Sequence, residues 1–258
     1  MLLESVSSGA VHEISEAEWQ VRVDLAACYR LVAHYGWDDA LGTHISARVP
    51  GAEEHFLLNP YGMMFGEMRA SELVKIDLDG NIITPTPHRV NAAGFTVHSA
   101  VHAARADISC VIHLHTMDGV AVSTLARGLL PLAQGSMLLQ PHLAYHRYEG
   151  VAFNLAERER LQRDLGDRSL MILRNHGTLA TGPTVADAFA AAYRLERACT
   201  IQIRAMSTGV VLQAVDPDVT GRVEEQSRQI GMESRTNREL AWPALRRMLD
   251  RINPGYDA

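Results

Sequence analysis

Lysine is nearly absent from this chain: among its 258 residues, Lys75 is the only one. Lysine and arginine together number 24 against 30 aspartates and glutamates, which gives a formal net charge of −6 at pH 7. A protein that binds nucleic acid needs a basic face to neutralise phosphates, and an acidic membrane surface attracts basic segments in the same way. The composition therefore argues against both kinds of partner.

Long apolar runs are also missing. No stretch approaches the roughly 20 apolar residues that cross a membrane, and the first residues lack the basic and apolar regions of a signal peptide. The three cysteines, Cys28, Cys110 and Cys199, are an odd number and stand far apart, which is not the pattern of a disulfide framework. We therefore expect a cytoplasmic protein.

What is present is an ordinary globular composition, with 47% hydrophobic and 21% charged residues. Apolar spacing and capping signals predict helices from Ser15 to Gly36, over 93–105, 117–126 and 157–165, from Thr184 onward and over 242–252. Short apolar runs predict strands over 44–49, 55–59, 74–78, 110–116 and 170–173. We expect a long loop around Pro131 and Gly135, another loop over 144–150, and a mobile polar connection over about 212–240.

Helices and strands alternate irregularly in this pattern, and a turn of hairpin type is predicted at residues 79–81. Such an order favours a mixed α/β sandwich over a regular parallel ladder of strands and helices. The length suits one large domain. We therefore expect residues 1–258 to form a single domain.

Three of the 12 histidines suggest a metal site. Side chains alternate between the faces of a strand, so His113 and His115 share one face, with Cα atoms about 6–7 Å apart. His176 follows the apolar strand over 170–173 directly. Three neutral imidazoles suit Zn²⁺, Fe²⁺, Mn²⁺ or Co²⁺, and three protein ligands leave a position open for substrate. The spacing equally allows histidines that are hydrogen-bonded in a core or cleft.

A second histidine pair stands on the predicted helix before that strand. His98 and His102 are four residues apart and share one helix face. They are candidates for metal ligands or for groups that support the ligands, and the alternative, favoured for His102, is a half-exposed helix face. Glu196, on the long helix that begins at Thr184, is expected to form a salt bridge.

Several segments resemble the class II aldolase/adducin family, and they follow one another along the chain in the order that the family has. The resemblance runs from about residue 18 to 207, with residues 208–258 as a polar connection and a short terminal helix; Arg247–Asp250 also looks like an adducin head domain. The segments that carry the resemblance are 42–48, 73–81, 91–100, 103–107, 110–116 and 173–177.

The resemblance implies a three-layer α/β/α sandwich with a central, mostly antiparallel sheet. It implies a homotetramer of C4 type with active sites at subunit interfaces. It also implies a zinc ion bound by His113, His115 and His176, which acts as a Lewis acid on the carbonyl of a ketose-phosphate-like substrate.

The chain departs from the sugar-phosphate members of that family. They place Ser-Ser-Glu where this chain has Ala92-Ala93-Gly94, and their Glu moves the substrate proton. His98, one helical turn after Gly94, is therefore our candidate for the catalytic proton carrier. Adducin head domains share the Ala-Gly-Phe sequence found here, so the resemblance is to the adducin-like branch.

Further residues are candidates for contact with the substrate. The phosphate-side Gly-Asn pair of the sugar-phosphate members falls on Thr43 and His44. These two residues and Asn91, the first residue of the matching segment 91–100, are expected to bind substrate. Weaker candidates for proton transfer are Tyr145, His146 and Tyr148.

Three functions fit the sequence. The first is a lyase of aldolase or decarboxylase type that uses a divalent metal and acts on a small oxygenated carbonyl substrate. The second is an Fe(II)-dependent oxygenase on the same scaffold. The third is a non-catalytic interaction module, as adducins are in the cytoskeleton. Because the chain lacks the Lys-rich tail of adducins, we expect no bundling of actin or spectrin.

Overall fold

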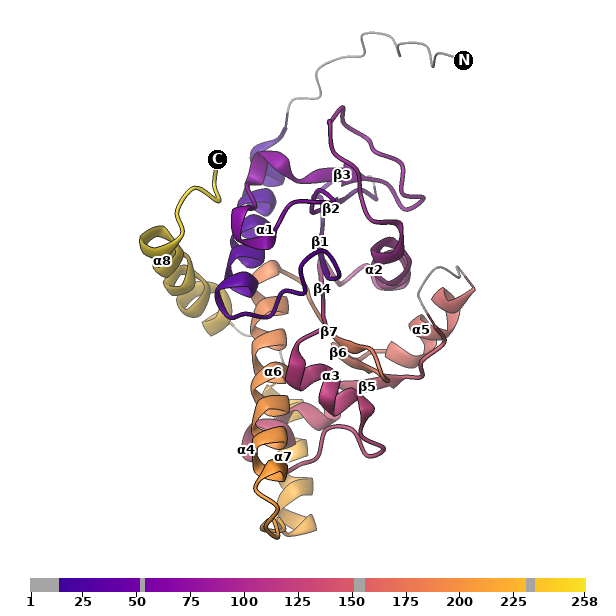
Figure 1. Cartoon of the computed structure of the whole chain (residues 1–258), viewed down its shortest axis with the longest axis vertical. Helices are drawn as coiled ribbons and strands as arrows, with labels where there is room; N and C mark the ends of the chain where they lie inside the picture. The colour runs from indigo at the N-terminus through magenta and orange to yellow at the C-terminus, as the bar shows by residue number, and fades with distance from the viewer. Residues whose placement is uncertain (1–13, 52–53, 151–155, 231–234) are drawn as a thin grey trace.

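One open sheet of seven strands forms the centre of the fold (Figure 1). The computed structural model describes residues 14–51, 54–150, 156–230 and 235–258. The strands are β1 (His44–Arg48), β2 (Phe56–Leu58), β3 (Val74–Ile76), β4 (Cys110–Leu114), β5 (Leu143–His146), β6 (Leu170–Leu173) and β7 (Gly177–Gly182). Their order across the sheet is β3-β2-β1-β4-β7-β6-β5. All neighbours pair antiparallel except β5 and β6, which are parallel.

Helices cover both faces of this sheet (Figure 1). They are α1 (Glu16–His34), α2 (Ala92–Ala104), α3 (Met117–Thr124), α4 (Gln134–Leu139), α5 (Glu157–Leu165), α6 (Val185–Ser207), α7 (Pro217–Ile230) and α8 (Trp242–Ile252). Helices α1, α3 and α6 pack on one face, and α2 and α5 lie on the other. The predicted three-layer α/β/α sandwich with a mostly antiparallel sheet is therefore confirmed.

Strand β4 separates the two halves of the core. Cys110, Ile112 and Leu114 belong to the apolar cluster under α1 and α6, whereas Val111 belongs to the cluster under α2 and α5. Because side chains alternate along a strand, His113 emerges on the same face as Val111. The alternation thus places a polar ring on the face that α2 covers.

The first helix begins and ends as the sequence predicts. Ser15 caps α1 by accepting a hydrogen bond from the Glu18 amide at 3.2 Å. The helix ends at His34, and Gly36 follows with a φ of +67°, which favours glycine. Helix α5, strand β6 and helix α8 also have the predicted bounds.

Five elements were not predicted. The expected loop around Pro131 and Gly135 contains α4, and the expected loop over 144–150 begins within β5. The expected mobile connection over 212–240 contains α7 and a π-helical turn, Asn237–Ala241. These loop predictions are therefore wrong where the helices and the strand lie. Strand β7 has glycine at both ends and is buried along its whole length, so it shows no alternation of polar and apolar residues. Helix α7 carries few apolar residues, and only Ser227 in it is buried.

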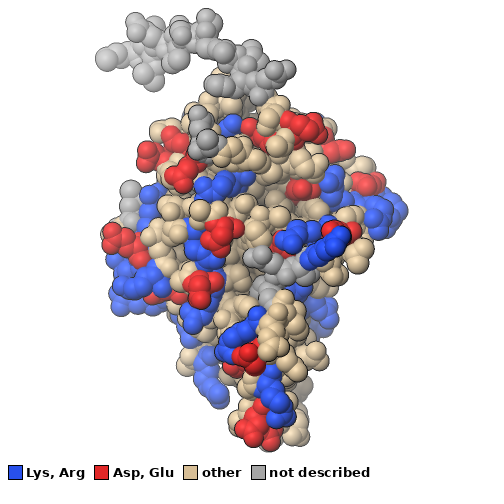
Figure 2. Space-filling model, turned by 180° about the vertical axis from the view of Figure 1, so that it is seen from behind, with Lys and Arg blue, Asp and Glu red and all other residues tan. Residues whose placement is uncertain are grey.

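Charges of both signs are mixed on the surface. On the face shown in Figure 2, Lys and Arg side chains lie among Asp and Glu side chains. Ion pairs of the protein include Arg160 with Glu149 at 2.5 Å and Arg246 with Asp24 at 3.2 Å. Such pairs near the surface each contribute little to stability. Among the described residues, no helix combines the length and apolar character that crossing a bilayer requires.

Candidate functional site

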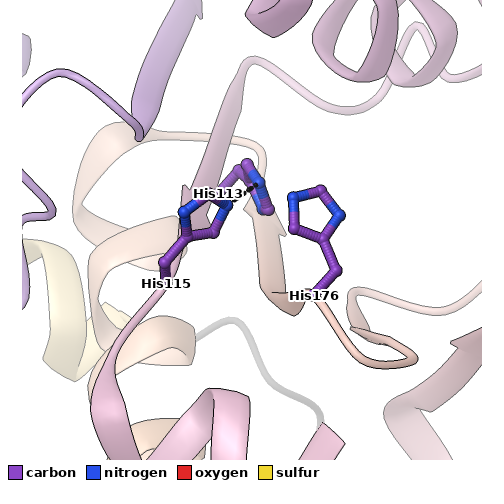
Figure 3. Close-up of side chains that lie close together, drawn as sticks. All are labelled: His113, His115 and His176. Carbon is purple, nitrogen blue, oxygen red and sulfur yellow. Dashed lines mark hydrogen bonds between the residues drawn. The ribbon is translucent and has the colours of Figure 1, made fainter. Parts of the chain in front are cut away.

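Three histidine rings meet at one end of strands β4 and β7. His113 belongs to β4, His115 follows its last residue, and His176 lies in the turn between β6 and β7. The ring centroids of His113 and His115 are 4.7 Å apart, and each lies 4.8 Å from the centroid of His176. One nitrogen from each ring lies within 4.8 Å of the others, and the rings turn toward one another (Figure 3). The structure therefore brings together the three histidines that the sequence singled out.

The turn that carries His176 depends on two unusual residues. Asn175 has a φ of +55°, a left-handed conformation that asparagine tolerates better than most residues. At Gly177, a Cβ atom would overlap the carbonyl oxygen of Leu114 and lie 3.1 Å from Cδ2 of His115. The absence of a side chain at Gly177 thus allows the turn to approach the end of β4 closely.

Hydrogen bonds fix the orientation of two of the rings. Nδ1 of His113 lies 3.0 Å from the carbonyl oxygen of Thr178, which can only accept, so Nδ1 carries the hydrogen. Nδ1 of His115 donates to Oδ2 of Asp39 at 3.1 Å. The Nε2 atoms of the two rings, 3.0 Å apart, therefore both present lone pairs.

Burial keeps two of the rings, those of His113 and His176, in the uncharged form that can bind a metal. Desolvation, with smaller effects from the neighbouring histidines, lowers the pKa of His113 well below its usual value. Desolvation and His115 lower the pKa of His176 to about 4. At neutral pH these two imidazoles are therefore neutral.

A second group of histidines lies beside the triad, on the face covered by α2. His44 is the Cα partner of His113 across the β1–β4 pair, and its ring centroid is 6.1 Å from that of His98. Oγ of Ser46 lies 2.7 Å from Nδ1 of His98 and 2.8 Å from Nε2 of His102. His44 thus lies between the triad and the two histidines of α2.

Several polar atoms of this second group have no partner among the described residues. They are Oγ1 of Thr43, Nδ1 of His44, Nε2 of His98 and Nδ1 of His102. Asn91 Nδ2 lies 3.0 Å from Nε2 of His44 and can donate to it. Buried polar atoms normally find a partner, so this group is a place where a bound molecule could supply one.

His102 is not on a half-exposed face, as the sequence suggested. Its side chain is buried and stacks on Phe56 of β2, with ring centroids 4.4 Å apart. The contact joins segments that are distant in sequence, so helical spacing alone could not reveal it.

The other singled-out residues have different surroundings. His146 is buried in β5 between Asp164 at 2.7 Å and Glu157 at 3.3 Å. The hydroxyl of Tyr145 accepts from the Leu129 amide, and the ring of Tyr148 lies 6.5 Å from that of His176. Tyr148, which is exposed, and His146 both line a small cavity beside His176.

Two residues near the triad were missed or misread. Asp39 comes from the loop after α1, and no sequence signal links it to His115. Glu196 was expected to form a salt bridge, but its buried carboxylate instead accepts hydrogen bonds from the hydroxyls of Thr116 and Thr178.

The burial of His102 predicts a loss of stability in acid. Desolvation first, and Arg48 second, lower its pKa from 6.5 to about 3. The unfolded chain takes up this proton near pH 6.5 and the folded chain does not, so the free energy of unfolding falls as the pH falls from 6.5 toward 3. From pH 7 to pH 5 this one residue should contribute a loss of about 2 kcal/mol.

Urea unfolding at both pH values, in the presence of a chelator, measures this effect. The matched variant is His102→Gln, because its amide can replace the bond from Nε2 to Ser46 without a titrating group. The variant should lose less stability between pH 7 and pH 5 than the unmutated chain. An unchanged pH dependence would contradict the assignment.

Comparison with known proteins places these features in a family. Residues 23–203 match the model of the "Class II Aldolase and Adducin N-terminal domain" family. An aldolase class 2 family protein of Caulobacter vibrioides is 57% identical over 244 residues, which cover 95% of this chain and 94% of that protein. Alpha-adducin of Rattus norvegicus is 39% identical over 256 residues, covering 93% of this chain but 34% of the adducin.

A solved structure of a similar protein has the same fold. The crystal structure of an aldolase II superfamily protein from Pseudomonas syringae superposes with a TM-score of 0.90 at 48% sequence identity. The match covers 97% of this chain and all of that one. The motifs that suggested the family are thus supported by comparisons over nearly the whole length. The chain belongs to the class II aldolase/adducin family.

Proposed function

We propose that this protein is a lyase that uses a divalent metal and cleaves a carbon–carbon bond beside the carbonyl group of a small oxygenated substrate. His113, His115 and His176 would hold the ion. The observation that carries the proposal is the set of three rings around one space, with the Nδ1 atoms of His113 and His115 already engaged by acceptors.

The donor set fits a divalent ion. Two nitrogens that each lie about 2.0–2.1 Å from one ion are roughly 2.8–3.4 Å apart at angles from 90° to tetrahedral. The Nε2 atoms of His113 and His115 are 3.0 Å apart. Without a cation or a shared proton, their two lone pairs would repel each other. Zn²⁺ is our first choice, and imidazole ligands also accept Fe²⁺, Mn²⁺ and Co²⁺.

Such an ion, when bound, supplies Lewis-acid polarisation of a substrate carbonyl. The side chains of the protein must then move the proton. By the family resemblance, the position of the proton-transferring Glu is Gly94, which lies in the first turn of α2 and has no side chain to exchange a proton. Another group on the same face must therefore act.

His98 is the group that we assign to this step. Its Nδ1 is tied to Ser46 at 2.7 Å, whereas its Nε2 is buried and has no partner among the described residues. Desolvation, with contributions from His44 and His102, keeps the pKa of His98 well below its usual value, so Nε2 can offer a lone pair at neutral pH. Once protonated, the same atom would return its proton readily.

Thr43, His44 and Asn91 form the side of the site that we assign to the substrate. Oγ1 of Thr43 and Nδ1 of His44 are buried and unpartnered within the described part of the chain. The amide of Asn91 contacts the opposite nitrogen of His44. These groups can donate hydrogen bonds to hydroxyl or carbonyl oxygens of a small substrate.

The role of His98 predicts a specific loss of rate. In His98→Asn the shorter amide can keep the bond to Ser46 but offers nothing in place of Nε2. The cleavage rate should fall by about 10²–10⁴-fold, the usual contribution of general acid–base catalysis, while metal content and melting temperature change little. His102→Gln is the matched control, since His102 shares the bond to Ser46 but lies one turn further along α2. Equal activity of His98→Asn and the unmutated protein would remove His98 from the mechanism.

The proposed activity itself can be tested with a panel of substrates. The protein, loaded with Zn²⁺, Mn²⁺, Co²⁺ or Fe²⁺, would be incubated with small hydroxy-ketones and hydroxy-acids, with and without phosphate groups. Nuclear magnetic resonance would detect a new carbonyl product or carbon dioxide. We expect cleavage that stops on addition of a chelator. Oxygen consumption by the anaerobically purified Fe²⁺ form, without cleavage, would contradict the lyase.

Assembly into a homotetramer with sites at subunit interfaces belongs to the same proposal. It is supported by the family resemblance and by an apolar groove between α4, α6 and α7, which Leu138, Ile201 and Ile230 line. Ile201 and Ile230 are 42% and 69% exposed in the single chain. Native mass spectrometry should find four copies of the 28.4 kDa chain, and a monomer alone would contradict the assembly.

A further inference from the structure

We propose that Glu196 is a positioning residue that fastens both ligand-bearing segments of the histidine triad from the opposite face of the sheet. This inference rests on the proposed metal site and adds a residue that does not touch the ion. Glu196 belongs to α6, whereas His113 emerges on the face that α2 covers.

The carboxylate of Glu196 joins two threonines. Its side chain is buried, and the residue is only 3% exposed. Oε1 accepts a hydrogen bond from the hydroxyl of Thr178 at 2.8 Å, and Oε2 accepts one from the hydroxyl of Thr116. Each carboxylate oxygen thus serves a different segment of the chain.

Both threonines are directly connected to the triad. Thr116 follows His115 and caps α3 by accepting from the Gly119 amide at 3.1 Å. Thr178 lies two residues after His176, and its carbonyl oxygen accepts the hydrogen of Nδ1 of His113 at 3.0 Å. One carboxylate therefore fixes the backbone beside all three rings, and the Thr178 carbonyl sets which nitrogen of His113 faces the ion.

Burying a carboxyl group costs free energy unless the group is hydrogen-bonded. Desolvation raises the pKa of Glu196 to about 6, against the opposing effect of the two hydroxyls. An ionised carboxylate can accept from both threonines at once, whereas the amide of glutamine has only one accepting atom. The residue type is thus the one that can hold both hydroxyls in their observed orientation.

Close packing leaves this arrangement little freedom. A Cβ atom on Gly119 would lie 2.5 Å from Oγ1 of Thr116 and 3.2 Å from Oε1 of Glu196. Only glycine therefore fits at the helix turn that faces the network. A network held this tightly can transmit a small displacement of Glu196 to the ends of β4 and β7.

The test compares variants that differ by one hydroxyl group. Thr178→Val removes the bond to Glu196 with almost no change of shape, and Thr178→Ser restores the hydroxyl. Thr200→Val is the matched control, because it removes a similar threonine–carboxylate bond of the same helix α6, from Thr200 to Asp118 at 2.6 Å, without touching a ligand-bearing segment. Glu196→Gln tests the carboxylate itself.

The readouts are the Co²⁺ affinity, by competition with a chelator, and the visible spectrum of the Co²⁺ protein, which reports ligand geometry. We expect Thr178→Val and Glu196→Gln to bind Co²⁺ about 10–100-fold more weakly, the usual effect of losing support for a metal ligand, and to show an altered spectrum. Thr178→Ser should regain most of the affinity, and Thr200→Val should behave as the unmutated protein does.

The possible failures are distinguishable. If the unmutated protein binds Co²⁺ tightly and Thr178→Val binds it equally well, the positioning role of Glu196 is overturned and the metal site stands. If Thr200→Val weakens binding as much as Thr178→Val, general packing of α6 explains the effect and the inference is again overturned. If the unmutated protein binds no Co²⁺, the proposed function falls together with the inference. If Glu196→Gln fails to fold, the comparison of Thr178→Val with Thr178→Ser tests the positioning role of Glu196 by itself.

Discussion

Replacing His113 by alanine is expected to lower the affinity for a divalent ion by more than about 100-fold, since loss of a mere supporting group already costs 10–100-fold. His113 is the most enclosed of the three rings, and its Nε2 lies 3.0 Å from that of His115. Removing it takes away one of three ligands and the hydrogen bond from Nδ1 to the Thr178 carbonyl oxygen. Competition with a chelating dye would measure the affinity for Zn²⁺.

The loss of this buried hydrogen bond should also cost His113→Ala about 1–3 kcal/mol of stability, so binding must be measured well below the unfolding temperature. His115→Ala provides a second ligand variant with a more exposed ring. His34→Ala, at the exposed end of α1, is the control and should keep its affinity. If the two ligand variants bound Zn²⁺ as tightly as this control, the ligand assignment would be wrong.

Replacing Gly177 by alanine should damage both stability and metal binding. The new methyl group would overlap the carbonyl oxygen of Leu114, which is backbone and cannot rotate away. Since Thr178 pairs with Leu114 and Gly177 with Leu173, the ends of β4, β6 and β7 would have to separate. We expect a loss of about 1–3 kcal/mol, typical of overpacking, and a loss of Zn²⁺ affinity, because the turn that carries His176 moves away from His115.

Gly221→Ala is the matched control for this substitution. Gly221 lies in α7, and nothing stands within 4 Å of the position that its Cβ would take. Alanine there should leave the protein equally stable or stabilise it by about 0.5–1 kcal/mol. Urea unfolding and Zn²⁺ titration of both variants measure the contrast. A Gly177→Ala protein indistinguishable from Gly221→Ala would show that the close approach at the turn has no consequence.

The proximity of the three histidines could be predicted from the sequence because its signals are local. The alternation along β4 places His113 on a defined face, and the apolar run of β6 ends directly before the turn with His176. Although His115 lies beyond the last residue of β4, the chain keeps its direction long enough for both rings to meet. The helices α1, α5 and α8 were predicted for the same reason, since their caps and apolar spacing lie within the segment itself.

The parts that were missed depend on contacts between distant segments. Asp39 and His115 form a hydrogen bond although they are 76 positions apart in the sequence, and Glu196 and Thr116 do so at a separation of 80 positions. His102 is buried because Phe56 stacks on it. Strand β7 is buried on both faces in the middle of the sheet, so its glycines and threonines show no alternation that would reveal a strand. Local patterns carry no information on such pairings.

X-ray absorption at the metal edge, combined with elemental analysis, tests the metal centre most directly. The unmutated protein would be purified without chelator and supplied with Zn²⁺. We predict about one ion per chain, with nitrogen and oxygen neighbours at about 2.0–2.1 Å and the scattering pattern of imidazole rings. A protein that retains no ion, or an ion surrounded by sulfur at about 2.3 Å, would contradict the assignment of His113, His115 and His176.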